Sequence, residues 1–208
     1  MSRTTQGLMA LMVGLTAALL LTGLAAATNA EVEGLVSDGL RWTGRLAFFV
    51  FLIPWLASPL QTLFPSAFSK LLLRWRRRAG ISFGSIQVVH LGLIVWLYQI
   101  YEDPGVDVAT LVVGGSGIAL AIAMLITSFD GPLQLVGSRL WKALHRAGLY
   151  VCGFIYFFDF LVAPFLGGYD LLAYAPLMLL TTAAIGLRSI ALLKRRKMST
   201  AVVGAVAQ

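Results

Sequence analysis

The chain contains two histidines, His90 and His145, and each lies inside a long apolar run. Polar side chains are costly within a membrane-spanning helix and usually face the bundle interior, so both histidines are candidate functional residues. Two neutral imidazoles from different helices are a usual axial pair for the iron of a b-type haem. The alternative is that each histidine forms a hydrogen bond within the bundle. The spacing of the two residues leaves both interpretations open.

A further polar feature lies on the predicted helix 138–165. Residues at helical spacing from His145 share one face of it: Leu149, Cys152, Tyr156 and Asp159. We expect this face to point into the bundle. Arg45, in the predicted helix 38–63, lies at a similar depth to Asp159, and an ion pair would offset the cost of burying either charge. Arg45 could instead bind a haem propionate or extend to the membrane surface.

The composition indicates a membrane protein. The chain has 208 residues, of which 59% are hydrophobic and 12% charged. A soluble domain of this length could not bury so much apolar surface. We expect an all-α fold, a polytopic membrane bundle of six transmembrane helices that forms one domain over residues 1–208. The expected helices span about 7–28, 38–63, 80–101, 108–128, 138–165 and 171–193.

The charged residues alternate in sign from one connection to the next. Basic residues gather in 70–78, 139–146 and 194–197, and acidic residues in 31–38, 102–107 and at 170. Basic connections stay in the cytoplasm, so this pattern predicts that both termini are cytoplasmic. The same clustering explains the net charge of +7 through membrane lipid contact and gives no reason to expect nucleic acid as a partner. Within the first basic stretch, Arg77 and Arg78 could also face an acidic electron donor or an anionic cofactor.

The first thirty residues allow two interpretations. A short basic start, an apolar middle and a small-residue end also fit a cleavable signal peptide. The apolar run is longer than a typical signal core, which favours a retained first helix. Cleavage would leave five helices and an N-terminus outside the cytoplasm.

Three stretches resemble the ferric-reductase-like transmembrane domain family. Within that family they are most similar to the bacterial haem-binding membrane subunits of the periplasmic protein-methionine-sulfoxide reductase system. The stretches are TGRLAFFVFLIPWLASPL (43–60), RRRAGISFGSIQVVHLGLIVWLY (76–98) and TSFDGPLQLVGSRLWKALHRAGLY (127–150). The TSFD turn followed by WKALHR is the most specific part. The resemblance implies a six-helix bundle with b-type haem in the bacterial inner membrane.

The resemblance also implies roles for particular residues. His90 falls on the family's third-helix ligand and His145 on its first fifth-helix ligand, so both would be axial ligands of the haem iron. Independently of the resemblance, Arg45, Arg77 and Arg78 are candidate cofactor-binding residues, with Arg77 and Arg78 as a patch that faces the electron donor or a haem propionate. Family members carry a further histidine thirteen residues after the first fifth-helix ligand, and here that position is Phe158. We therefore expect one haem. Counted from the basic connections, His90 lies about two turns deeper than His145.

The function that the resemblance implies is electron transfer. Electrons would pass from a cytoplasmic flavin or quinol source towards an acceptor at the outer face. The protein would be an oxidoreductase membrane subunit that needs a partner, such as a cytoplasmic flavin reductase or a periplasmic reductase, for a full reaction. The alternative is a six-helix membrane protein without haem, either a small transporter or an assembly subunit.

Overall fold

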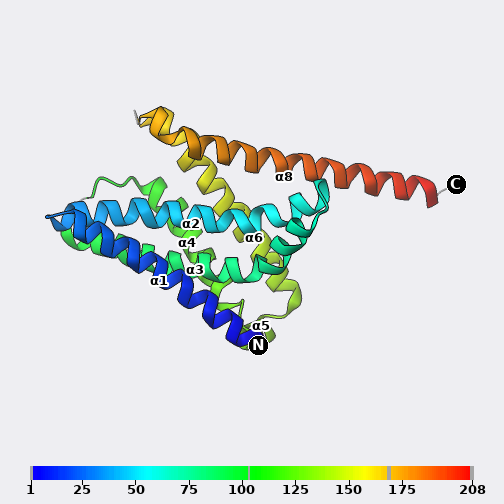
Figure 1. The fold of residues 1–208 in the computed structure, drawn as a ribbon, viewed down its shortest axis with the longest axis horizontal. Coiled ribbons are helices and arrows are strands. Elements are labelled where there is room, and N and C mark those ends of the chain that lie inside the picture. Colours follow the sequence, from blue (N-terminus) through cyan, green and yellow to red (C-terminus); the bar gives the residue numbers. More distant parts are fainter. Residues whose placement is uncertain (1, 103, 168–169, 207–208) are drawn as a thin grey trace. The chain divides into compact units, whose positions relative to one another are not determined.

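Helices make up almost all of the described chain (Figure 1). The computed structural model describes residues 2–102, 104–167 and 170–206, and these residues contain no strand. Within these residues, six helices are long and apolar enough to cross a membrane, which confirms the predicted all-α fold and its six candidate spans. They are α1 (Arg3–Thr28), α2 (Val32–Leu63), α3 (Ala67–Ile100), α4 (Val108–Ile126), the stretch Ser138–Leu166, and α8 (Leu171–Val206) with a span ending at Met198.

The observed helix boundaries correct one prediction. The stretch 64–80 was expected to be a connection, but α3 begins at Ala67 and runs for 34 residues to Ile100. Its first turn is capped by Ser66, whose Oγ accepts a hydrogen bond from Ser69 N at 3.2 Å. Leucine and arginine favour helix, so the basic stretch continues as helix despite its charge. A short additional helix, α5 (Asp130–Val136), precedes the fifth span.

The fifth span contains a π-helical segment. It consists of α6 (Ser138–Phe157), the π-helix η1 (Phe158–Val162) and α7 (Ala163–Leu166). Pro164 has no N–H for the Phe160 carbonyl, and Ala163 N–H donates to the Phe158 carbonyl, five residues back.

The π-helix interrupts the polar face that the sequence predicts on this span. Leu149, Cys152 and Tyr156 are buried as expected. Asp159 is exposed, so the prediction that the whole face points inward is wrong at this residue. A π-turn holds more residues than an α-turn, which moves Asp159 off the α-helical spacing.

The chain forms two compact units. Unit 1 comprises Met1–Phe51 with Arg77–Ile155, and unit 2 comprises Leu52–Arg76 with Tyr156–Gln208. Both boundaries within the first half of the chain fall inside helices, since α2 and α3 each contribute to both units. The single domain therefore stays a prediction.

Unit 1 is built around its part of α3. Ser82 Oγ of α3 donates to the Ala10 carbonyl of α1 at 2.7 Å. On α2, the Phe51 ring centroid lies 5.4 Å from that of Phe83. On α4, a Cβ added at Gly84 would lie 2.7 Å from the Leu125 Cβ. The unit-1 segment of α3 therefore contacts α1, α2 and α4.

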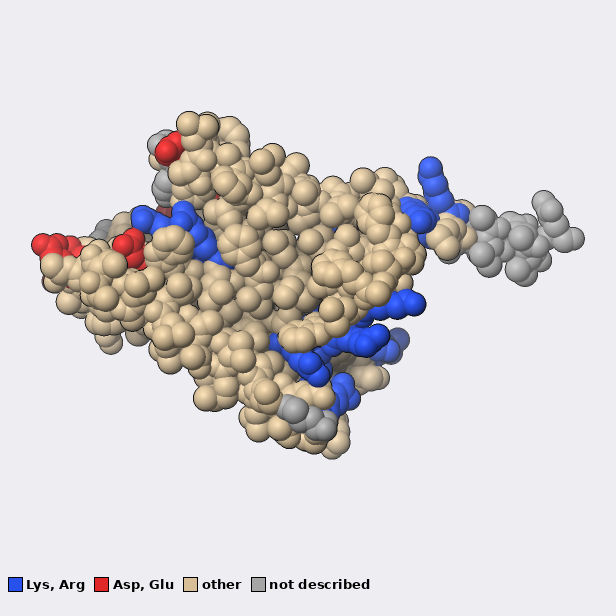
Figure 2. All heavy atoms as spheres, viewed as in Figure 1, with Lys and Arg blue, Asp and Glu red and all other residues tan. Residues whose placement is uncertain are grey.

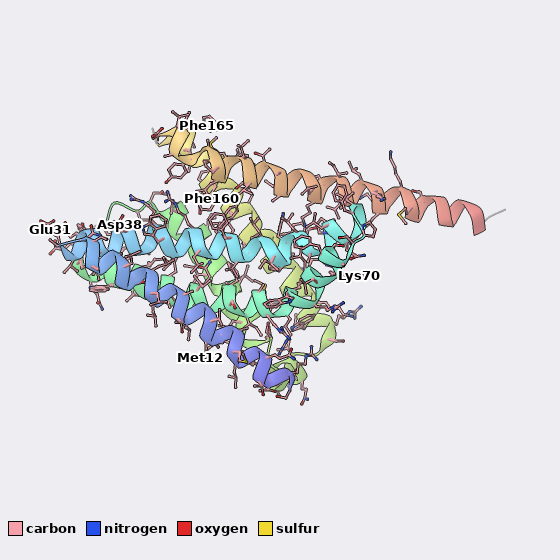
Figure 3. All side chains as sticks on the ribbon, viewed as in Figure 1. Met12, Glu31, Asp38, Lys70, Phe160 and Phe165 are labelled. Carbon is pink, nitrogen blue, oxygen red and sulfur yellow. The ribbon has the colours of Figure 1, made fainter. Side chains whose placement is uncertain are left out.

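The outer surfaces of the spanning helices are apolar. Met12 of α1 is 59% exposed and points away from the ribbon (Figure 3). Figure 2 shows that neither acidic nor basic side chains cover most of the drawn surface. In water such a surface would be costly, whereas a bilayer accepts it. The structure thus describes a multi-pass membrane protein with lipid-facing helices. Glu31 lies at the α1–α2 connection, and Asp38 lies further along, inside α2 (Figure 3).

Candidate functional site

His90 forms a hydrogen bond with Thr43 on the neighbouring helix α2. The distance from His90 Nδ1 to Thr43 Oγ1 is 2.8 Å, and Thr43 is fully buried. The Thr43 hydroxyl also donates to the Gly39 carbonyl at 2.7 Å. Because a hydroxyl has one proton, a Thr43 that donates to Gly39 must accept from His90. This pattern assigns the imidazole proton to Nδ1 and leaves a lone pair on Nε2.

Small residues on α2 allow α2 and α3 to approach at this level. A Cβ added at Gly44 would lie 3.7 Å from His90 Cε1, and one added at Gly39 would lie 3.2 Å from Leu93 Cδ1. The two glycines flank Thr43, so its hydroxyl can reach the imidazole from within the α2 surface.

His145 lies in a different environment, against the turn that joins α4 to α5. Its Nε2 is 3.4 Å from Ser128 Oγ, a long contact for a hydrogen bond. The Trp141 ring lies 4.2 Å from the imidazole, between centroids, and Trp141 Nε1 donates to the Thr127 carbonyl at 3.0 Å. The structure thus brings together the two parts of the sequence pattern, TSFD and WKALHR.

Arg77 binds the same turn rather than an open cavity. Its Nε and Nη2 donate to the Ser128 carbonyl at 3.2 and 2.7 Å, and its Nη1 donates to the Arg3 carbonyl at 3.1 Å. Arg3 in turn lies 3.8 Å from Asp130, measured from Nε to Oδ1. Arg77 therefore joins α3, the N-terminus of α1 and the 127–130 turn.

These contacts fix the relative depth of the two histidines. His145 and Arg77 both contact Ser128, so they lie at one level of unit 1. His90 lies further along α3, and the thirteen residues from 77 to 90 correspond to about 20 Å of helical rise.

The packing of α4 also shows that His90 lies further along the helix axes than His145. Gly84 of α3 and Gly148 of α6 both pack against residues 124–125 of α4. Gly84 is thus level with Gly148. On α6, Gly148 lies three residues past His145, and on α3, His90 lies six residues past Gly84. The nine residues together correspond to about 14 Å of rise. The structure therefore separates the imidazoles by about 14 to 20 Å along the helix axes.

The predicted axial pair does not fit one haem in this arrangement. Two axial ligands bind one iron from opposite faces, so their imidazoles must lie at the same depth. With its proton on Nδ1, His90 retains a lone pair on Nε2, whereas His145 lies in the Ser128–Trp141 contact. Among the residues that the structure describes, no three His, Cys, Asp or Glu side chains form a group that could hold a metal ion.

The remaining predicted site residues are Arg45, Arg78 and Asp159. The Arg45 guanidinium lies over the Trp42 ring, 5.1 Å from its centroid, and Arg45 is two residues from Thr43. Arg78 follows Arg77 on α3 and is half-buried. Arg45 and Asp159 belong to different units, so their ion pair stays a prediction.

Sequence reasoning assigned no role to Thr43 or Ser128. Both lie in the stretches that carry the family resemblance, Thr43 as the first residue of TGRLAFF and Ser128 in TSFD. Their hydroxyls contact residues 47 and 17 positions away in the sequence, so the pairing depends on how the helices pack.

No family model, curated protein or solved structure matches this chain. The resemblance to the ferric-reductase-like family therefore stays a prediction, and the site is interpreted from its own geometry.

Proposed function

We propose that the protein transfers electrons across a membrane through a b-type haem, with His90 as a ligand of the haem iron. The observation that best supports this is the bond between Thr43 Oγ1 and His90 Nδ1, at 2.8 Å. Histidines that bind metals usually donate their other N–H to a neighbouring oxygen, which fixes the ring and makes Nε2 a better donor. A bound haem would supply one-electron redox chemistry at its iron.

His145 and Arg77 have a structural role in this proposal. Both bind the 127–130 turn, so they join α3, α4 and α6 at one end of unit 1. Arg45, two residues from Thr43, remains the candidate for contact with a haem propionate, and Arg78 the candidate for contact with an acidic electron donor.

The wider assignment depends on the charge pattern and the family resemblance. We place the protein in the bacterial inner membrane with both termini in the cytoplasm. A cytoplasmic flavin reductase or a quinol would supply electrons, and a periplasmic reductase would accept them. The protein would then be an oxidoreductase membrane subunit.

A membrane protein without haem is the second candidate. The separation of His90 and His145 favours it, since a bis-histidine site would need both at one depth. In this case the Thr43–His90 bond satisfies a polar side chain within the helices and has no redox role.

A reduced-minus-oxidised absorbance spectrum of the purified protein, expressed with haem supplied, separates the candidates. We expect a haem band in the wild type, with about one haem per chain. His90→Ala should abolish this band. His145→Ala is the matched control, since it removes the other histidine and should leave most of the band.

Each outcome has a defined meaning. A wild type without a haem band would overturn the electron-transfer proposal and leave the second candidate. Loss of the band in both variants would mean that the histidines share one iron, contrary to their separation in the structure. A band that survives His90→Ala would show that His90 is not the ligand.

A further inference from the structure

Arg188 lies beside a proline-disrupted turn of α2 in unit 2. Pro59 has no N–H to donate to the Trp55 carbonyl four residues back, and Arg188 Nη1 donates to that carbonyl instead, at 2.8 Å. The guanidinium also lies over the Trp55 ring, 4.1 Å from its centroid. Trp55 Nε1 donates to the Ala184 carbonyl at 3.2 Å. Arg188 is therefore held by two contacts to Trp55, and Trp55 is held in turn by its bond to α8.

Two more arginines approach the same turn. Arg195 lies two helical turns past Arg188, and its Nη2 is 2.7 Å from Thr62 Oγ1 and 3.3 Å from the Ser58 carbonyl. From α3, Arg76 Nη1 lies 3.4 Å from Ser58 Oγ. Ser58 thus lies between two guanidinium groups from different helices.

An open pocket lies among these groups. It is lined by Ser58, Pro59, Arg188, Ala191, Leu192 and Arg195. Arg76 is close enough to Arg188 and Arg195 to be repelled by both. The lining therefore combines two guanidinium groups and a hydroxyl with an apolar wall from α2 and α8.

The part of unit 2 around this pocket has an excess of positive charge. Residues 52–76 contain no acidic residue, and the acidic residues of 156–208 are Asp159 and Asp170. Asp170 lies eighteen residues before Arg188, or about 27 Å along a helix. Arg76 and Arg195 form no ion pair with the residues that the structure describes. Converging cations of this kind favour a bound anion.

We propose that this pocket binds a phosphate group, carried by the headgroup of an anionic membrane lipid. Guanidinium groups bind phosphate oxygens through paired N–H donors, and the Ser58 hydroxyl can donate a further hydrogen bond. The apolar residues Pro59, Ala191 and Leu192 would face the glycerol and acyl part of the lipid. Anionic lipids of the cytoplasmic leaflet are attracted to basic helix ends. This inference does not depend on the haem proposal.

Lipid binding to the delipidated full-length protein tests this inference by native mass spectrometry and thermal unfolding in detergent. Phosphatidylglycerol should bind and raise the unfolding midpoint, and phosphatidylcholine should bind more weakly. Arg76→Gln and Arg195→Gln should each weaken phosphatidylglycerol binding by about tenfold, as expected for the loss of a charged hydrogen bond. Arg196→Gln is the matched control, because it removes the same charge beside Arg195 and should bind the lipid like the wild type.

Inorganic phosphate is added in a second arm to identify the source of the group. Stabilisation by phosphatidylglycerol but not by inorganic phosphate supports a lipid headgroup. Stabilisation by inorganic phosphate, lost in Arg195→Gln, supports the phosphate site but assigns it to a soluble ligand. Equal weakening by Arg195→Gln and Arg196→Gln, or no binding of either probe, would overturn the proposal.

Discussion

The hydroxyl of Thr43 lies between two hydrogen-bond partners, the Gly39 carbonyl and the His90 imidazole. Histidine is a candidate ligand in any apolar helix, and sequence is enough to select His90 on that ground. Its ring orientation and proton position depend on a partner 47 residues earlier, which sequence does not reveal. Residue types could therefore be predicted, but their partners could not.

Removing the Thr43 hydroxyl should weaken haem binding at His90. Thr43→Val keeps the shape of the side chain but cannot hold the imidazole, and changes to such supporting residues weaken metal binding by about 10- to 100-fold. Thr43→Ser keeps the hydroxyl and should retain haem. Haem retention during purification, followed by absorbance, measures both effects.

A matched control and a haem-free measurement complete this experiment. Thr22 bonds within its own helix, to the Ala18 carbonyl at 3.0 Å, so Thr22→Val should leave haem unchanged. Nitrogen-15 NMR of the His90 ring should show the proton on Nδ1 in the wild type without haem. Equal haem retention in Thr43→Val and wild type would show that Thr43 does not support haem binding.

The helices themselves follow closely from the sequence, because long apolar runs bounded by Pro, Gly and charged residues predict spans well. The exceptions have local causes. The basic stretch before Gly80 has good helix formers and joins α3, and Pro164 introduces a π-turn into the fifth span. The axial offset between α3 and α6 is a property of packing. Counting from the loops indicated two turns between His90 and His145, fewer than the packed helices show.

The packing of α1 on α3 depends on Gly14. A Cβ added there would lie 2.5 Å from the Ser82 carbonyl oxygen and 2.9 Å from the Ser82 Cα, both backbone atoms that cannot move aside. Gly14→Ala should therefore destabilise the protein by about 1–3 kcal/mol, the usual cost of overpacking. Gly23→Ala is the control in the same helix, since its Cβ would have no neighbour within 4 Å.

Unfolding by denaturing detergent, followed by circular dichroism, compares the two α1 variants. The midpoint should fall for Gly14→Ala and stay near the wild-type value for Gly23→Ala. Equal midpoints for all three proteins would mean that α1 does not pack on α3 as the structure shows.

At the scale of the whole molecule, the charges at the helix ends indicate the orientation of the protein in the membrane, which the fold does not. Glu31 lies in the α1–α2 connection and Glu33 in the first turn of α2, and Asn29 Nδ2 donates to Asp38 Oδ2 of α2 at 3.1 Å. Basic stretches follow the C-terminal end of α2, at 70–78, and occupy the C-terminal part of α8, at 194–197. Helix packing is the same for either orientation in a bilayer, so the charges are the available guide to which ends face the cytoplasm.

We predict that the acidic α1–α2 connection faces outward and that the basic end of α8 faces the cytoplasm. Cys152 is buried, and replacing it with serine provides a background without cysteine. In that background, Glu31→Cys should react with a membrane-impermeant maleimide in intact cells. Lys197→Cys should react only after the cells are opened. Labelling of Lys197→Cys alone in intact cells would reverse the orientation, and labelling of both sites would contradict the odd number of spans between them. Both positions are exposed, so failure to label reports the membrane barrier rather than burial in the protein.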